Sequence, residues 1–88
     1  MSPQVSIIMP VRDEQPRVGP AMQRLARDFP DCELIIVDGG SHDGTFTAAE
    51  DAAVNLNARV LVTASAPGRA TQMNHGARCA TRRQSVAD

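Results

Sequence analysis

The chain has 88 residues, of which 42% are hydrophobic, and this is enough for one small core and too little for a second domain. Nine arginines and ten acidic residues give a net charge of -1 without any run of like charge, which excludes the long-range field that gathers nucleic acid or an anionic membrane. Only two residues are aromatic, so no platform exists for stacking several bases, and we expect no nucleic-acid partner.

Three short apolar runs rich in β-branched residues predict strands, at residues 5–10, 34–37 and 59–63. Such continuous runs are typical of a parallel sheet that is covered on both faces. The first run also lacks the positive lead and the length of a secretory or membrane-spanning segment, so we expect no membrane span and a cytoplasmic location.

Helical spacing separates the predicted strands. After the first strand one apolar face is formed by Val18, Met22, Leu25, Ala26 and Phe29. After the second strand a face is formed by Thr45, Phe46, Ala49, Ala53 and Leu56, with Asp43 as the expected N-cap. After the third strand a stripe is formed by Ala70, Met73, Ala77 and Ala80, and the pattern is lost from Thr81 onward.

The resulting β-α-β-α-β-α order predicts an α/β fold, a Rossmann-like domain in which a three-stranded parallel sheet carries helices on both faces. The first strand of such a sheet is usually flanked on both sides, yet the chain offers no fourth strand. We therefore expect the edge of the first strand to be open and the chain to self-associate through it.

The segment LIIVDGGSHDGT (residues 34–45) brings two aspartates to the carboxyl end of a strand, where parallel α/β folds bind ligands. Its glycines fit neither a P-loop nor a dinucleotide fingerprint, and Asp38 and Asp43 are too far apart for a phosphatase motif. A carboxylate here suits the N–H and O–H groups of a nucleobase or ribose. A tight turn is the alternative for Asp38, for which we favour the ligand role, whereas for Asp43 we favour helix capping.

Three segments together, SIIMPVRDE, ELIIVDGGSHDGT and PGRATQMNHGARCA, resemble the start of a family 2 glycosyltransferase with the GT-A fold. The resemblance spans Val5 to about Thr81 and is closest to the bacterial branch with a Gly-Arg-x-x-Gln-x-Asn-x-Gly segment. It implies a nucleotide-diphosphate sugar as partner. The nucleotide-binding residues that it implies are Pro10 and Glu14 beside the nucleoside, Asp38 on the base, Gly39, Gly40 and Ser41 around that pocket, and Arg69, Gln72 and Asn74 near the diphosphate.

Two parts of this assignment have independent chemical readings. Arg69 at a helix start is a sound grip for an anion, because the helix dipole and the charge add, and a solvated arginine is the equal alternative. Without the resemblance, Gln72 and Asn74 would be interpreted as surface residues. Val11, Asp13 and His42 depart from the usual motifs and leave the base preference open.

The two histidines and the two cysteines predict no metal or redox site. His42 and His75 read as structural or solvent-facing, since neither has a second ligand at metal spacing. Cys32 and Cys79 lack Cys-x-x-Cys spacing and read as reduced, buried thiols.

The family continues into a fourth strand with an Asp-x-Asp motif, which binds Mn or Mg at the diphosphate, and nothing after Asn74 resembles it. The resemblance therefore implies that residues 1–88 are the truncated N-terminal nucleotide-binding half of a GT-A domain, inactive alone in sugar transfer because neither metal motif nor catalytic base is present. A non-catalytic nucleotide-binding or interaction module that completes a partner through its open first strand is the alternative. A third possibility is a fragment that only dimerises.

Overall fold

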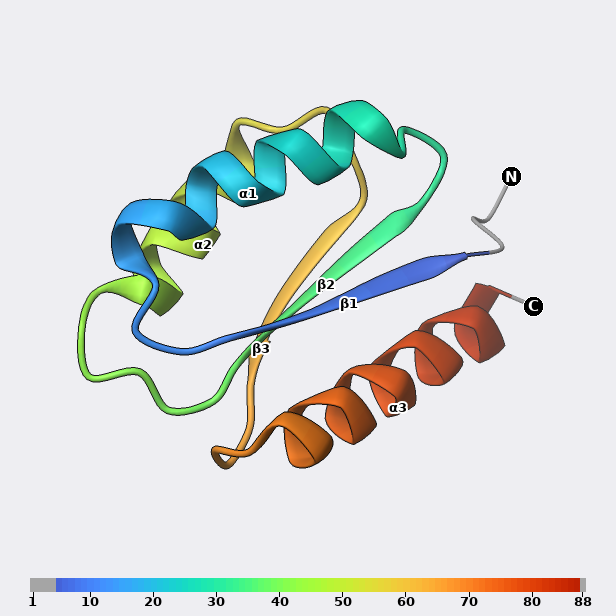
Figure 1. The fold of residues 1–88 in the computed structure, drawn as a ribbon. Helices are drawn as coiled ribbons and strands as arrows, with labels where there is room; N and C mark the ends of the chain where they lie inside the picture. Colours follow the sequence, from blue (N-terminus) through green and yellow to red (C-terminus); the bar gives the residue numbers. More distant parts are fainter. Residues whose placement is uncertain (1–4, 88) are drawn as a thin grey trace.

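The computed structural model describes the backbone of residues 5–87 and the side chains of residues 5–80. Strands and helices alternate along the chain, as the sequence predicts (Figure 1). The elements are β1 (Ser6–Val11), α1 (Gln15–Asp28), β2 (Glu33–Asp38), α2 (Thr45–Val54), β3 (Val60–Ala64) and α3 (Arg69–Ala87).

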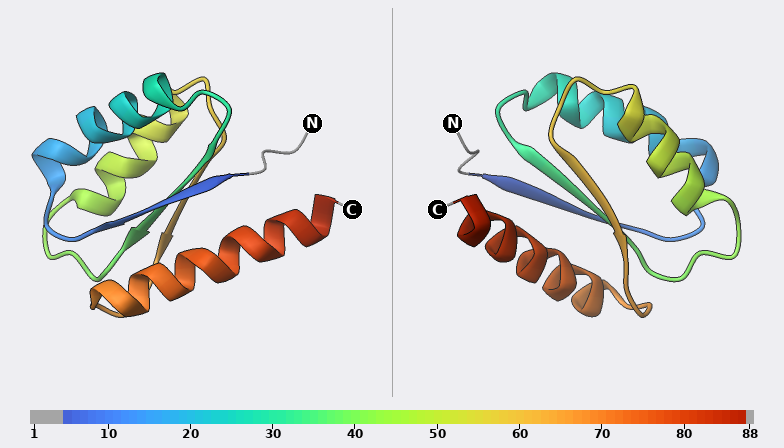
Figure 2. Two further views of the ribbon diagram at one scale, coloured as in Figure 1. Left: turned by 45° about the vertical axis from the view of Figure 1, so that its right-hand side comes forward. Right: turned by 180° about the vertical axis from the view of Figure 1, so that it is seen from behind.

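The three strands form one parallel sheet in the order β1-β2-β3, so β2 lies in the centre. Helices α1 and α2 cover one face of the sheet, and α3 crosses the other (Figure 2). Every residue of β2 is buried, which explains its unbroken apolar run, whereas most of β1 is half-buried. The predicted α/β class, with a parallel sheet and helices on both faces, is confirmed.

The core lies mainly between β2 and the α1–α2 layer. Val18 and Met22 of α1 pack with Leu34 and Ile36 of β2, and Ala49 of α2 closes the cluster. These side chains carry the hydrophobic stabilisation of the domain, since each is removed almost wholly from water.

The opposite face of the sheet is covered through a close helix approach. A Cβ atom at Gly76 of α3 would lie 2.5 Å from Ile8 Cγ2 and 3.2 Å from Val37 Cγ2. Glycine therefore lets α3 pack directly on β1 and β2, and this contact fixes where α3 begins relative to the strand ends.

Three predictions about the elements are wrong. Phe29 does not join the core but lies beyond the end of α1, 48% exposed. The helix that was expected to lose its pattern at Thr81 continues to Ala87. Strand β1 runs through Pro10 to Val11, which an edge strand tolerates because the missing N–H belongs to the side without a neighbour.

Candidate functional site at the carboxyl edge of the sheet

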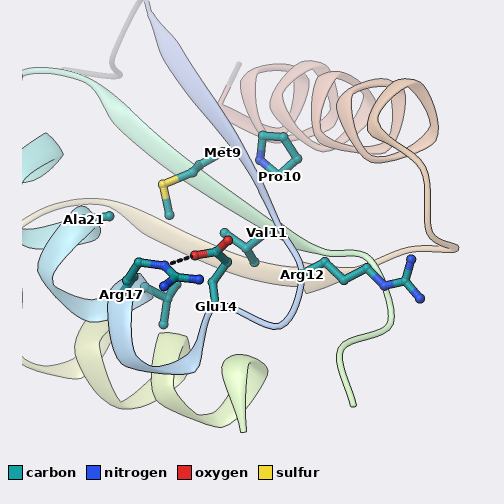
Figure 3. Close-up of a pocket in the computed structure, with 8 residues that line it drawn as sticks. Met9, Pro10, Val11, Arg12, Glu14, Arg17 and Ala21 are labelled. Carbon is teal, nitrogen blue, oxygen red and sulfur yellow. Dashed lines mark hydrogen bonds and ion pairs between the residues drawn. The ribbon is translucent and has the colours of Figure 1, made fainter. Parts of the chain in front are cut away.

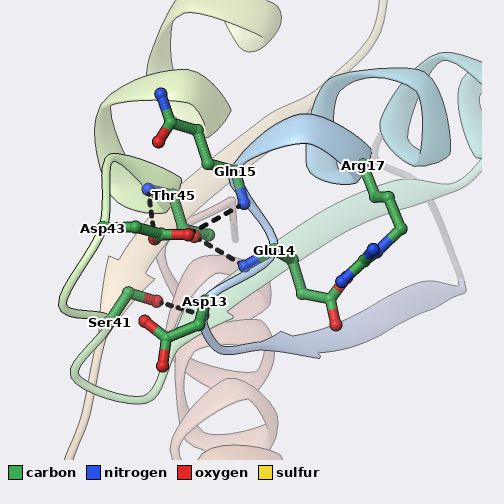
Figure 4. Close-up of polar contacts among 7 residues, drawn as sticks. All are labelled: Asp13, Glu14, Gln15, Arg17, Ser41, Asp43 and Thr45. Atoms are coloured by element: carbon green, nitrogen blue, oxygen red, sulfur yellow. Dashed lines mark hydrogen bonds and ion pairs between the residues drawn. The ribbon is translucent and has the colours of Figure 1, made fainter.

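The predicted site residues gather where the strands end and the following loops begin. Asp38 is the last residue of β2 and pairs in register with Val11 of β1 and Ala64 of β3. Because the strands are parallel, the loops after β1, β2 and β3 all leave from this one edge. The contacts between the first two loops are drawn in Figure 4.

Asp38 is buried, with only 5% of its surface exposed. Its carboxylate accepts the Ser41 hydroxyl on Oδ1 and the Ser41 backbone N–H on Oδ2, the latter at 3.2 Å. The two bonds close the loop back on the strand end, with Gly40 in the left-handed region at φ 82°. Asp38 thus has a turn-forming role.

Ser41 also joins the second loop to the first. Its hydroxyl oxygen accepts the backbone N–H of Asp13 at 2.8 Å, and in return the His42 backbone N–H donates to Asp13 Oδ1 at 2.7 Å. Asp13 has a left-handed φ of 52°, a conformation that Asp tolerates better than most residues. This backbone bend directs the Asp13 N–H and carboxylate toward the same neighbouring loop.

A second set of bonds fixes the starts of α1 and α2. The Glu14 backbone N–H donates to Thr45 Oγ1 at 2.8 Å, and the Gln15 N–H donates to Asp43 Oδ2 at 3.3 Å. The Gly44 N–H returns a bond of 3.1 Å to Gln15 Oε1. Both helices therefore begin from a shared hydrogen-bonded corner.

Asp43 is not the N-cap that the sequence predicts, because that position belongs to Gly44. Its Oδ1 nevertheless accepts the Thr45 N–H at 2.9 Å, and the Thr45 hydroxyl donates to the same oxygen. The hydroxyl bond is the main cause that lowers the pKa of Asp43 below the usual 3.8, and backbone N–H donors from Thr45 and Gln15 add to it.

Glu14 lies at the mouth of a groove between β1 and α1. Its Oε2 accepts Arg17 Nε–H at 2.5 Å, and this bond, followed by the charge of Glu14, raises the pKa of Arg17. Arg17 is largely exposed and Glu14 is partly exposed, so the pair contributes little to stability.

The groove has a volume of about 220 Å³, and Pro10 and Glu14 both line it, with the Pro10 ring turned toward α3 and away from Glu14 (Figure 3). This is below the roughly 300–1,000 Å³ that buries most of a drug-sized ligand. The groove is therefore too small to bury a ligand of that size. Its lining residues are Met9, Pro10, Val11, Arg12, Glu14, Arg17, Val18 and Ala21.

Gln72 is buried, so its expected surface position is wrong. Its Nε2 donates to the carbonyl oxygens of Val11 and Val37, at 3.0 and 2.9 Å, and so holds the ends of β1 and β2 together. Gly39 makes room for it, because a Cβ there would lie 2.5 Å from Gln72 Oε1. Gly39 and Gln72 thus pack together beneath the loop, and we call this packed pair the joint at the strand ends.

Arg69 and Asn74 lie on the exposed surface of α3, Arg69 as the first residue of the helix. Among residues 5–80, neither side chain has a hydrogen bond or ion pair. Arg12 is a further exposed cation of this edge, in the loop after β1, and sequence reasoning missed it. Its place directly after a strand end was the signal that could have found it.

The described residues do not fit the Mn or Mg site that the resemblance implies for the whole family. No group of three or more His, Cys, Asp and Glu side chains within them could hold an ion. Asp13, Asp38 and Asp43 instead accept hydrogen bonds from the two loops. No step of a reaction is therefore assigned to a metal held by these carboxylates.

None of the helices within residues 5–87 has the length and apolar character needed to cross a membrane.

Comparison with known proteins gives one match. A family model described as "Glycosyl transferase family 2" matches residues 6–84, which is most of the chain. No curated protein and no solved structure matches.

Proposed function

The chain belongs to glycosyl transferase family 2, and from this premise we propose that it binds the nucleotide of a nucleotide-diphosphate sugar and supplies the nucleotide-binding part of a sugar transfer. In this proposal residues 1–88 correspond to the N-terminal half of a GT-A domain.

The observation that carries the proposal is the coupling of two loops at the carboxyl edge of a parallel sheet. Glu14 and Asp38, the two carboxylates expected beside the nucleoside, lie at the ends of different strands, Glu14 after β1 and Asp38 as the last residue of β2. The backbone N–H of Asp13 donates to Ser41 in the loop after β2 and that of Glu14 donates to Thr45 at the start of α2, which holds the two segments in one arrangement. A preformed pair of acceptors suits the N–H and O–H groups of a base and a ribose.

The diphosphate would be held by cations of the same edge. Arg69 begins α3, where the guanidinium and the helix dipole both favour an anion. Arg12 adds a second exposed guanidinium after β1. Arg17 is less suited, because Glu14 already accepts its Nε–H.

Chemical transfer needs more than this binding. The leaving diphosphate requires stabilisation of its charge, and the acceptor hydroxyl requires a general base. The family resemblance implies that the charge-stabilising group and the general base both come from the later half of the domain. We therefore expect the 88-residue chain to bind nucleotide without turning over a nucleotide sugar.

Calorimetric titration with uridine, guanosine and thymidine diphosphates tests this proposal. We expect saturable binding of at least one of them, and loss of that binding in Asp38→Ala. The matched control is Asp51→Ala, which removes an exposed carboxylate of α2 and should leave binding unchanged. Turnover of a sugar nucleotide by the 88-residue chain with manganese would contradict the expectation that this chain binds nucleotide without transferring sugar. Absence of binding would contradict the nucleotide site itself.

A second candidate function, an interaction module, is favoured by the edge position of β1. Within the described residues β1 has a strand neighbour on one side only, and Val5 just before it is 57% exposed. An unpaired edge is a template for a second copy of the chain. Val5→Lys should reduce association in light scattering, whereas Val54→Lys, at an 84% exposed position of α2, should not. A wild-type chain that stays monomeric at high concentration would contradict self-association.

A further inference from the structure

Strand β1 presents a row of backbone groups to which no other described strand is paired. The carbonyl oxygens of Val5 and Val11 accept N–H groups of the β2 segment, each at 3.0 Å. Since successive residues of a strand turn their backbone groups to opposite sides, those of Ser6, Ile8 and Pro10 point away from β2. The free edge therefore offers N–H groups and carbonyl oxygens, except that Pro10 has no N–H.

An apolar groove lies beside this edge, between β1 and α1. Met9, Val11 and Ala21 are among the residues that line its volume of about 220 Å³ (Figure 3). Val5, just before the strand, is 57% exposed. Because side chains alternate along a strand, Val5 belongs to the same face of the sheet as Met9 and Val11. One face of β1 thus has an exposed valine at its beginning and an apolar groove at its end.

We propose that β1 pairs with the β1 strand of a second copy of this chain, antiparallel and about a two-fold axis at Ile8. This inference rests on the interaction module named above as the second candidate function, and it specifies how that module pairs. A two-fold axis that joins two identical edges makes the strands antiparallel. In this pairing residues 6–10 lie across from residues 10–6 of the other copy.

The free backbone groups complement one another in this register. The two Ile8 residues exchange both N–H···O bonds, and the Ser6 N–H of each copy donates to the Pro10 carbonyl oxygen of the other. The missing N–H of Pro10 costs only the bond to the Ser6 carbonyl, which lies at the start of the strand. A register centred on Pro10 would lack both central bonds, so the proline limits which registers can form.

The same register brings the exposed valine of each copy to the groove of the other. Val5 lies directly across from Val11 of the second copy, and Ile7 lies across from Met9. Ile7 and Met9 already pack against the core on this face of the sheet. The symmetry removes both exposed valines and both grooves from water at once, which is the apolar complement of the hydrogen bonds.

Disulfide trapping tests this register. In the background Cys32→Ser with Cys79→Ser, the variant Val5→Cys with Val11→Cys places thiols across from each other in a pair that exchanges no backbone bonds. Such a pair has Cα atoms about 4.5 Å apart, within the roughly 4.4–6.8 Å that a disulfide spans. We expect mild oxidation to link residue 5 of one copy to residue 11 of the other. Val5→Cys with Val54→Cys, at an 84% exposed position of α2, is the matched control and should give no link between these two positions.

Light scattering of the wild-type chain separates this inference from self-association itself. A chain that stays monomeric at high concentration would overturn both. A dimer in which residues 5 and 11 do not cross-link, or link no faster than residues 5 and 54, would overturn the pairing through Ile8 and leave self-association standing.

A second measurement needs no substitution. NMR of a mixture of isotope-labelled and unlabelled wild-type chain detects contacts between copies only. Antiparallel pairing about Ile8 should give a cross-peak between the Hα atoms of Ile7 and Met9 of different copies, because these residues form a closely spaced pair without backbone bonds. A cross-peak that connects Val5 with Met9 instead would show a shifted register and would overturn the proposal.

Discussion

The backbone N–H of Asp13 donates to Ser41 Oγ at 2.8 Å, across 28 residues of sequence. The same hydroxyl donates to Asp38, so the loop after β1 and the end of β2 share one hydrogen-bonded group. A residue without charge thereby connects the two carboxylate-bearing loops of the candidate site.

Ser41→Ala should uncouple the loops. The variant leaves Asp38 Oδ1 and the Asp13 N–H without this partner, which should lower the free energy of unfolding by about 1 kcal/mol and weaken nucleotide binding. Urea unfolding followed by circular dichroism measures the first effect. Ser65→Ala is the control, because within the described residues that hydroxyl bonds only the adjacent Ala66 carbonyl. Equal stability of the two variants would argue against the bridging role.

Asp13→Ala should be more damaging than Asp13→Asn. Asparagine keeps the oxygen that accepts the His42 N–H and also tolerates the left-handed φ, whereas alanine loses both advantages. We expect a loss of roughly 1–2 kcal/mol for alanine and a much smaller one for asparagine. Thermal unfolding of the two variants checks this order, and equal losses in both would show that the carboxylate charge matters rather than its oxygen.

Gly39→Ala should disrupt the joint at the strand ends. The new Cβ would displace Gln72 and break its bonds to the Val11 and Val37 carbonyls, which should lower the free energy of unfolding by roughly 2–3 kcal/mol.

The control for this glycine lies in α1. Apart from its chain neighbours and the helix backbone, Gly19→Ala meets nothing closer than Ala52 Cβ at 3.8 Å. The higher helix propensity of alanine is opposed by Pro20, which disfavours a helical residue with a Cβ before it, so we expect a smaller change in stability than at Gly39. Denaturant titration of both variants measures the contrast, and destabilisation by Gly19→Ala alone would contradict the packing described here.

Asp43 should contribute a pH-dependent part of the stability. Its folded pKa lies below the usual 3.8, so the folded state binds fewer protons there than the unfolded state. The contribution is full above about pH 4 and is lost as the pH falls through the folded pKa. Asp43→Asn should therefore reduce stability at pH 6 and differ less from the wild type near pH 2.5. A stability difference that stays constant between these pH values would show that the carboxylate charge has no part in it.

The order of the elements could be predicted because apolar residues recur with different spacings in strands and in helices. The placement of Asp38 followed from the same pattern, since a strand end is visible as the end of an apolar run. The burial of Gln72 could not be predicted, because it depends on α3 crossing two strand ends at close range beside Gly39. The bond from Asp13 to Ser41 likewise needs two loops that the sequence alone does not bring together.

Other features were within reach of the sequence. His75 and Cys79 are four residues apart in a segment that was already predicted to be helical, so their proximity could have been inferred. The exposure of Phe29 follows from Pro30, because a residue before proline rarely continues a helix.

Amide NMR during nucleotide diphosphate titration of the 88-residue chain tests the central claim most directly. We expect the largest shift changes at Glu14, Arg69 and residues 38–41, because the proposed nucleotide lies over the carboxyl edge of the sheet. A well-folded chain whose amide signals stay unchanged with uridine, guanosine and thymidine diphosphates, with and without manganese, would contradict the proposed nucleotide site.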